Sequence, residues 1–196
     1  MLQKPENMCI GAGNQRDSLF LIDYGMAKAY RNADGTHIDK PSDKAMCVGT
    51  QAFMSRRCQT SRRDDIESWF YVISSCVSGR LPWSTHAQKF EESFARSGQK
   101  WTKESITLNT DIQQQKEALF ASGGANLDLP SELHLVLRHI SGLSFIAKPD
   151  YRYLANALQS WRRTGRHQEK KVCLMHNHNN SPRATPGWKR KGYFDE

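Results

Sequence analysis

The sequence predicts a mainly α-helical domain that carries a small β-hairpin near its start. Two short apolar runs flank a glycine-containing turn between residues 8 and 22, a pattern typical of a hairpin. A nearly continuous apolar stretch at 69–77 indicates a buried helix at mid-sequence, and later segments place apolar residues at helical spacing. Hydrophobic residues make up 38% of the chain, and five residues are tryptophan, as expected for a folded domain.

The predicted hairpin has its first strand at residues 8–10, a turn at 11–14 and its second strand at 18–22. We expect the second strand to be buried and Gly25 to turn the chain with a positive φ. Asp23 follows the strand directly, and the hairpin should bring it near Asn7. A carboxylate there needs a partner, and a divalent cation is one, although Asp-x-Gly after a strand is also an ordinary turn.

The central helix is predicted to begin at Ser61 or Asp64, either of which can cap it, and to end at Gly79. Because residues 69–77 are apolar nearly all round, we expect this helix to be buried and the other helices to pack around it. The preceding stretch, residues 25–60, has no sustained periodicity, which favours a functional or a disordered segment.

Four further helices follow the central one. Residues 88–96 and 111–121 are predicted to form surface helices, the second with a modest apolar stripe. Another helix begins near Pro130, and the last begins at Lys148. The predicted inward-facing residues are Ile112, Leu119 and Phe120, then Leu133, Leu137 and Ile140, then Tyr151, Leu154, Leu158 and Trp161.

The chain is divided into a domain at 1–165 and a basic, disordered tail at 166–196. The formal net charge is +8, and the tail holds seven basic and three acidic residues, which is +4 of that excess. Five scattered cysteines form no evident pairs, so reduced thiols are expected. No apolar run reaches the ~20 residues of a membrane-spanning helix, and the first residues lack a signal-peptide core. A cytoplasmic or nuclear protein is therefore predicted.

Six motifs occur in order along the chain, and they are Lys4-Pro5-Glu6-Asn7, Ile22-Asp23-Tyr24-Gly25-Met26-Ala27-Lys28, Gly49-Thr50, Ser61-Arg62-Arg63-Asp64-Asp65-Ile66-Glu67-Ser68, Leu81-Pro82-Trp83 and Lys148-Pro149-Asp150-Tyr151. In this order and close to this spacing they resemble the casein kinase 1 superfamily, and the segment from Pro130 to His134 is more similar to its tau-tubulin kinase branch. The resemblance covers roughly residues 2–165 and implies the C-terminal lobe of a protein kinase, with the N-lobe absent.

The resemblance implies a role for each of five residues. Asn7 and Asp23 would bind Mg²⁺ beside the phosphates of ATP, as oxygen ligands suit that ion. Lys4 would contact the transferred phosphate. Thr50 would end the activation segment and help to orient the catalytic loop. Asp65 would support the backbone of that loop from the start of the central helix.

Departures from the family pattern put catalysis in question. Leu2 stands where the family has its catalytic aspartate, and leucine cannot accept a proton. The glycine-rich loop, its lysine and the adenine hinge are absent from the sequence, so binding of ATP by this chain is in doubt. Two interpretations stay open: a serine/threonine kinase domain that is truncated and inactive alone, or a pseudokinase-like module that binds a protein partner.

Three other patterns have both a functional and an ordinary interpretation. Arg56, Arg57, Arg62 and Arg63 would form a site for acidic or phosphorylated protein segments, or a solvated face. A zinc site in the tail is less favoured than a flexible surface, because no fourth ligand is fixed. A basic cluster near the end is better explained by solvation than by specific nucleic-acid binding. The tail residues concerned are Cys173, His176 and His178 for zinc, and Lys189, Arg190 and Lys191 for nucleic acid.

Overall fold

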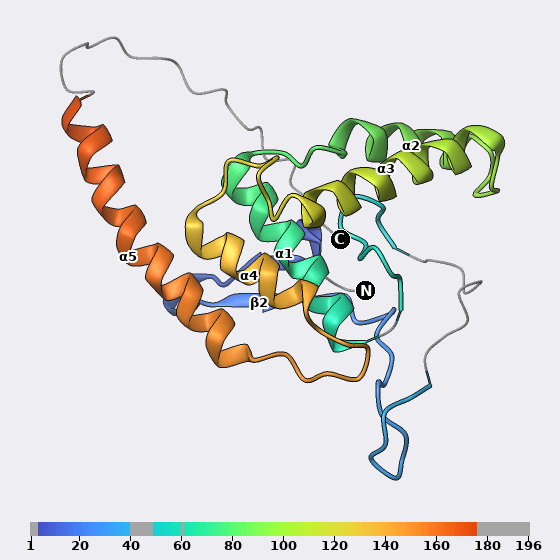
Figure 1. The fold of residues 1–196 in the computed structure, drawn as a ribbon, viewed down its shortest axis with the longest axis horizontal. Coiled ribbons are helices and arrows are strands. Elements are labelled where there is room, and N and C mark those ends of the chain that lie inside the picture. Colours follow the sequence, from blue (N-terminus) through green and yellow to red (C-terminus); the bar gives the residue numbers. More distant parts are fainter. Residues whose placement is uncertain (1–3, 40–48, 60, 176–196) are drawn as a thin grey trace, which may run out of the picture.

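The protein is mainly α-helical and carries one small antiparallel hairpin, as predicted (Figure 1). The computed structural model describes residues 4–39, 49–59 and 61–175, with side chains up to Arg163. None of the helices described is long and apolar enough to cross a membrane. The elements in order are η1 (Pro5–Asn7), β1 (Met8–Ile10), η2 (Gly13–Gln15), β2 (Leu19–Leu21), α1 (Arg62–Ser78), α2 (Ser84–Arg96), α3 (Lys103–Ala121), α4 (Ser131–Ser141) and α5 (Tyr151–Met175).

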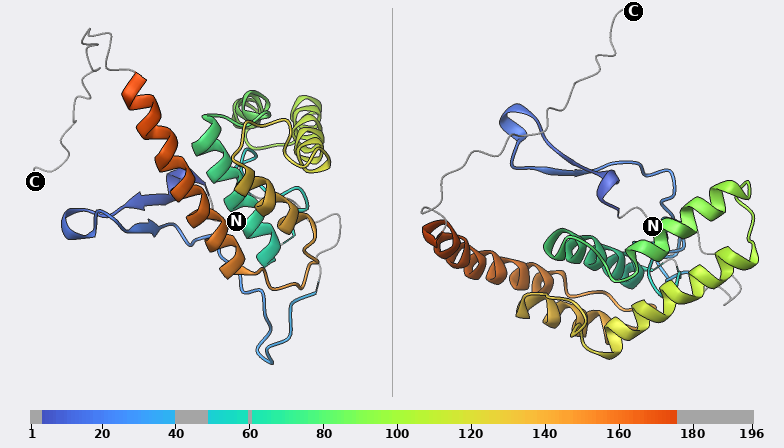
Figure 2. Two further views of the ribbon diagram at one scale, coloured as in Figure 1. Left: turned by 60° about the vertical axis from the view of Figure 1, so that its left-hand side comes forward. Right: turned by 90° about the horizontal axis from the view of Figure 1, so that it is seen from above.

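Strands β1 and β2 pair antiparallel, with Met8 opposite Leu21 and Ile10 opposite Leu19. The hairpin extends beside the helices rather than between them (Figure 2). Its apolar side chains are therefore exposed to solvent: Ile10 is 76% exposed and Leu19 is 67% exposed. The prediction that the second strand is buried is therefore wrong, because no described element covers the outer part of this sheet.

Helix α1 begins and ends where its sequence signals predict. The Ser61 hydroxyl oxygen accepts a hydrogen bond from the backbone N–H of Asp64, and Gly79 follows the helix in the left-handed region with φ 78°. The buried face is more polar than expected, since it includes Asp64, Glu67 and Ser68 beside the apolar residues. Burial of the two carboxylates requires partners, and the irregular segment 49–59 supplies them for Asp64 and Glu67.

Helices α2 and α3 pack against each other as a long antiparallel pair (Figures 1 and 2). Helix α3 begins earlier than predicted because Thr102 and Ser105 form a capping box at its first turn. It is not simply a surface helix, since Ile112, Lys116 and Leu119 are completely buried. The predicted stripe is thus part of the core, with a lysine in its middle.

The core surrounds α1 and is rich in aromatic rings. The centroids of Tyr71 and Trp83 lie 5.0 Å apart in an edge-to-face arrangement, and Phe70 meets Phe120 edge-on at 6.4 Å. Helix α4 packs on α1 and on α5. Its predicted inner residues are confirmed as buried, and they are Leu133, Leu137 and Ile140.

Helix α5 departs from its prediction at both ends. Leu154 is buried as expected and Ala157 is buried beside it, but Tyr151 is 47% exposed. The helix continues to Met175, past the predicted domain end at 165. Residues 176–196 lie outside the described residues, so the rest of the tail prediction stays a prediction.

The stretch between the hairpin and α1 is irregular, as its sequence indicates. Among its described residues, an isolated bridge joins Arg31 and His37. Cys58 is disulfide-bonded, which contradicts the expectation that all cysteines are reduced thiols. Cys9 and Cys76 are free.

Candidate functional site

The open end of the hairpin brings three predicted site residues together. Asn7 ends η1, is buried, and accepts the backbone hydrogen bond from Ile22 N–H at 2.9 Å through its carbonyl oxygen. The same short helix places Lys4 beside it, with Asn7 N–H donating to the Lys4 carbonyl at 3.0 Å. Asp23 follows Ile22 directly. The antiparallel register alone thus holds Asn7 and Asp23 at one end of the sheet.

Asp23 adopts an uncommon backbone conformation, with φ 61°. The positive φ predicted for Gly25 occurs at Asp23 instead, because an aspartate tolerates this region when its side chain bonds locally. Its Oδ1 accepts a long, 3.4 Å hydrogen bond from Gly25 N–H. The side chain is exposed, so most of the capacity of the carboxylate to accept bonds faces solvent.

The donor set at this end suits Mg²⁺. An amide oxygen and a carboxylate are hard oxygen ligands, and Mg²⁺ keeps several waters rather than requiring a cage of protein ligands. Throughout the described residues there is no cluster of three or more His, Cys, Asp or Glu side chains that could bind a metal by itself. The Mg²⁺-binding roles predicted for Asn7 and Asp23 stay predictions at this point.

The other predicted site residues are found on separate elements. Thr50 is half-buried, and its carbonyl accepts hydrogen bonds from Phe53 N–H at 3.0 Å and Met54 N–H at 3.1 Å. Asp65 lies in the first turn of α1 and is exposed. Leu2 lies outside the described residues. The roles assigned to these residues stay predictions.

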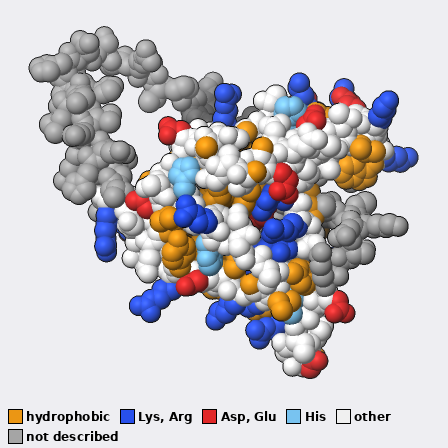
Figure 3. Space-filling model, viewed as in Figure 1, with side chains coloured by type: hydrophobic (Ala, Val, Ile, Leu, Met, Phe, Trp, Pro, Cys, Tyr) orange, Lys and Arg blue, Asp and Glu red, His pale blue; other side chains and the backbone are white. Residues whose placement is uncertain are grey.

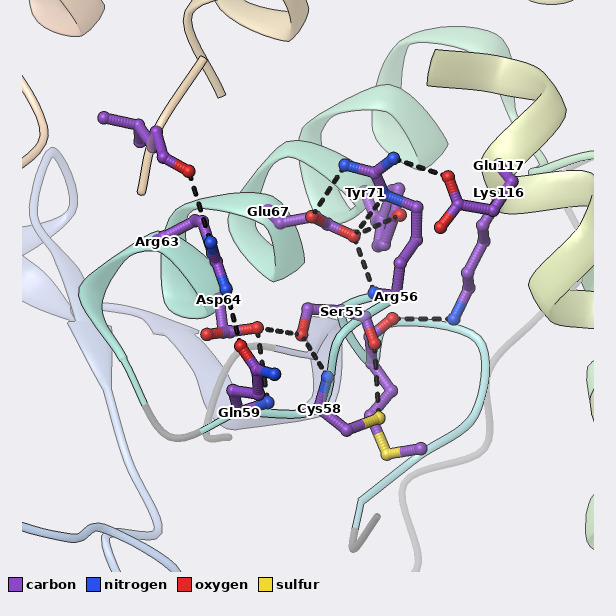
Figure 4. A network of polar contacts seen from close by, with 12 residues as sticks. Ser55, Arg56, Cys58, Gln59, Arg63, Asp64, Glu67, Tyr71, Lys116 and Glu117 are labelled. Carbon is purple, nitrogen blue, oxygen red and sulfur yellow. Dashed lines mark hydrogen bonds and ion pairs between the residues drawn. The ribbon is translucent and has the colours of Figure 1, made fainter. Parts of the chain in front are cut away.

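Lys116 is a buried cation that the sequence analysis missed (Figure 4). Its Nζ donates hydrogen bonds to the carbonyl oxygens of Gln51 and Met54, each at 2.7 Å. It also lies 5.3 Å from the ring centroid of Tyr71 and 5.5 Å from that of Trp83. Burial lowers the pKa of Lys116 from its ordinary 10.5 to about 7, although the nearby Glu67 carboxylate acts in the opposite direction.

A second buried network joins Arg56 to two glutamates (Figure 4). Glu67 is completely buried, and its Oε1 accepts hydrogen bonds from Arg56 N–H at 2.7 Å, Arg56 Nε at 3.1 Å and Tyr71 Oη at 2.8 Å. Arg56 also donates from Nη1 to Glu117 at 2.8 Å and stacks 3.4 Å from the ring centroid of Phe120. Both charges of the buried pair are therefore satisfied.

Asp64 forms the third link between α1 and the irregular segment. Its Oδ1 accepts from the Ser55 hydroxyl at 2.7 Å and from Gln59 N–H at 3.4 Å, while its Oδ2 accepts from the Ser61 hydroxyl. Burial raises the pKa of the Asp64 carboxyl, and the two hydroxyl donors oppose that rise. With Lys116 and Arg56, this contact fixes residues 50–59 on α1 and α3.

One sequence signal could have revealed Lys116. It lies four residues after Ile112 and three before Leu119, which places it on the apolar face of α3. A lysine at such a position is either a break in the stripe or a buried, paired cation. No local pattern reveals Arg56 and Glu67 in the same way, since their partners come from different elements.

The four arginines considered for an anion site do not converge. Arg56 is bound to two glutamates, and Arg63 donates to the Leu143 carbonyl and to Gln59 Oε1. Arg62 donates to the Ile146 carbonyl and stacks over a tyrosine. Arg57 alone among them is exposed. This arrangement favours structural roles for Arg56, Arg62 and Arg63.

Comparison with known proteins adds an independent observation. No family model matches the chain. Over 161 residues it is 32% identical to a "Probable casein kinase I homolog" of Encephalitozoon cuniculi. The chain is casein kinase I-like in sequence. The match covers 79% of this chain but 45% of that protein, so the chain spans less than half the length of this casein kinase I-like relative. The similarity supports a kinase-like domain of this type.

Proposed function

We propose that the chain is part of a casein kinase 1-like serine/threonine kinase domain, and that the open end of the hairpin is its Mg²⁺–ATP phosphate site. The observation that carries this proposal is the juxtaposition of Asn7 and Asp23, enforced by the strand register and by the Ile22–Asn7 backbone bond. The sequence similarity to a casein kinase I homolog supports it. The tau-tubulin kinase branch, suggested by residues 130–134, is part of the proposal.

Different residues of this chain would bind the metal ion, the phosphate and the protein substrate. Bound Mg²⁺ would neutralise charge on the transferred phosphate. Asn7 and Asp23 would hold the ion through an amide oxygen and a carboxylate oxygen, and Lys4 would contact the phosphate. The buried contacts of Lys116 and Arg56 hold the segment that begins at Thr50, where a protein substrate with serine or threonine would bind.

We further propose that this chain alone does not transfer phosphate. Leu2 occupies the position of the catalytic aspartate and offers no atom to orient or deprotonate a hydroxyl. The second candidate function is therefore a pseudokinase-like module that binds a protein partner. The exposed apolar side chains of the hairpin, including Ile10 and Leu19, favour this candidate because large exposed apolar surfaces mark interaction sites.

Paramagnetic Mn²⁺ with ADP can test the proposed metal site by NMR of the ¹⁵N-labelled chain. We expect line broadening confined to amides around Asn7 and Asp23, because Mn²⁺ takes the same hard oxygen ligands as Mg²⁺. Asp23→Ala should abolish the broadening. Asp17→Ala, which removes another exposed hairpin carboxylate, should leave it unchanged.

Line broadening that persists in Asp23→Ala, or that disappears in Asp17→Ala, would contradict the proposed metal site. A second assay, phosphorylation of casein by the purified chain with ATP and Mg²⁺, tests whether the chain alone transfers phosphate. We expect no transfer above background, in line with Leu2. Robust turnover that Asp23→Ala removes would show that the chain is a kinase by itself, and would refute the non-catalytic candidate.

A further inference from the structure

The connection between α2 and α3 forms an exposed, basic end of the molecule. We call residues 96–103 the α2–α3 tip; it contains Arg96, Lys100 and Lys103 and no acidic residue. All three side chains are exposed. The tip lies at the free end of the helix pair, away from α1, α4 and α5 (Figures 1 and 2). Figure 3 shows basic side chains around an apolar patch at this end.

An aromatic side chain forms the centre of the tip. Trp101 is 38% exposed, and its ring centroid lies 5.5 Å from that of Phe90 and 5.8 Å from that of Phe94. The two phenylalanine rings are themselves stacked at 5.5 Å. Ile106, one turn into α3, is 53% exposed and adds aliphatic surface. A fixed tryptophan that is partly open to solvent is the kind of residue that anchors binding interfaces.

The backbone of the tip is held in one tight conformation. Gly98 and Gln99 both lie in the left-handed region, with φ 65° and 63°. Gln99 N–H donates to the Phe94 carbonyl at 2.9 Å, and Lys100 N–H donates to the Ser97 hydroxyl at 3.1 Å. Gln99 carries a side chain at a φ that favours glycine, so the conformation is maintained against strain. A rigid surface loses less entropy when a partner binds.

We propose that the α2–α3 tip binds an acidic peptide segment of a partner protein. Trp101 contacts an apolar residue of the segment, and Lys100 and Lys103 pair with its carboxylates on either side. The charge favours this occupant, because Lys100 and Lys103 are exposed and no acid lies within the tip. Arg96 contributes less, since its guanidinium already lies 3.7 Å from the Glu104 carboxylate at the start of α3. None of the residues at the hairpin end takes part, so the inference does not depend on the proposed kinase function.

A nucleic acid fits the tip less well than an acidic peptide. Bases stack on an open aromatic face, whereas two phenylalanine rings already pack against Trp101. Lys100 and Lys103, beside an arginine that is already paired with Glu104, are also few cations compared with the roughly six to ten phosphate contacts of a nucleic-acid interface. An acidic peptide needs only one apolar anchor and a few charge pairs.

Fluorescence anisotropy tests this proposal with a labelled peptide in which Leu and Ile alternate with Asp and Glu. We expect the whole chain to bind it, and Lys100→Glu combined with Lys103→Glu to weaken binding by at least about tenfold. Trp101→Ala should weaken it by a similar factor. The matched control, Arg80→Glu combined with Arg152→Glu, makes the same change in net charge at exposed positions elsewhere and should leave the affinity within about twofold.

Three results would overturn the proposal. The first is no binding to the unmodified chain. The second is an equal loss in both double variants, which would mean attraction by net charge alone. The third is tighter binding of single-stranded RNA that the Lys100 and Lys103 changes abolish, which would make the tip a nucleic-acid site. If circular dichroism shows that Trp101→Ala unfolds the chain, the exposed lysine pair decides the outcome.

Discussion

At the residue scale, residues of the same type that lie close in the chain differ in whether they are buried. Asp64 and Asp65 are adjacent in the chain, yet Asp64 is buried and bonded to two serine hydroxyls while Asp65 is exposed. Lys103 and Lys116 lie on one helix, yet only Lys116 is buried, with two carbonyl partners. The partners, rather than the residue type, decide whether a charge can be tolerated inside the protein.

The buried lysine predicts an unusual dependence of stability on pH. Because the pKa of Lys116 is about 7 in the folded chain and 10.5 as its ordinary value, the unfolded chain binds the extra proton between these limits. The free energy of unfolding should therefore rise with pH from about 7 to about 10.5, with Lys116 contributing up to about 1.4 kcal/mol per pH unit. Below pH 7 both states are protonated and this contribution is constant.

Urea unfolding at a series of pH values measures this contribution. Lys116→Met should remove the Lys116 part of the slope. Lys89→Met changes an exposed lysine on α2 and should keep it, which separates the effect from general loss of charge. An identical slope in the unmodified chain and in Lys116→Met would contradict the assignment.

At the element scale, the helix ends are set by local chemistry. Ser61 and Gly79 cap α1, while Thr102 and Ser105 cap α3 reciprocally. In the α3 cap, Ser105 N–H donates to the Thr102 hydroxyl at 3.1 Å, and Thr102 N–H donates to the Ser105 hydroxyl at 2.8 Å. Each such bond satisfies a donor that the helix itself leaves unpaired.

The α3 cap predicts the effect of a conservative change. Thr102→Ala removes the hydroxyl acceptor and should lower the free energy of unfolding by about 1 kcal/mol. Thr102→Ser keeps an acceptor at the same position and should remain within about 0.5 kcal/mol of the unmodified chain. Chemical denaturation monitored by tryptophan fluorescence compares the three proteins. Equal stability of Thr102→Ala and the unmodified chain would show that the cap contributes nothing.

At the scale of the whole molecule, packing is uneven. The helices surround a buried aromatic core, whereas the two-stranded hairpin leaves large apolar side chains open to solvent. A two-stranded sheet is marginal when no other element covers it. Its strands, Met8–Ile10 and Leu19–Leu21, also carry no charged residue that would discourage pairing with another chain.

We therefore expect the chain to self-associate through the hairpin at micromolar concentrations. Ile10→Lys combined with Leu19→Glu places opposite charges at a cross-strand pair, so it should keep the hairpin while reducing association. Sedimentation velocity over a concentration series measures the change. Leu135→Lys, at an exposed position on α4, serves as the control and should associate like the unmodified chain. A strictly monomeric unmodified chain would refute this expectation.

Local sequence patterns determined most of the secondary structure of this protein. The caps of α1, the two strands of the hairpin and the inner face of α4 depend on residues a few positions apart, so the sequence predicts them correctly. The proximity of Asn7 and Asp23 follows from the same local pairing. Their proposed role also depends on the resemblance to casein kinase 1, which the pattern alone could not supply.

Only the tertiary structure decided which polar groups are buried and which apolar groups are exposed. The carbonyl acceptors of Lys116 lie 65 and 62 residues away in the sequence, and Glu117 lies 61 residues from Arg56. Exposure of Leu19 and Tyr151 likewise depends on which elements pack beside them. Burial and charge pairing depend on neighbours in space, and a periodic pattern records only neighbours along the chain.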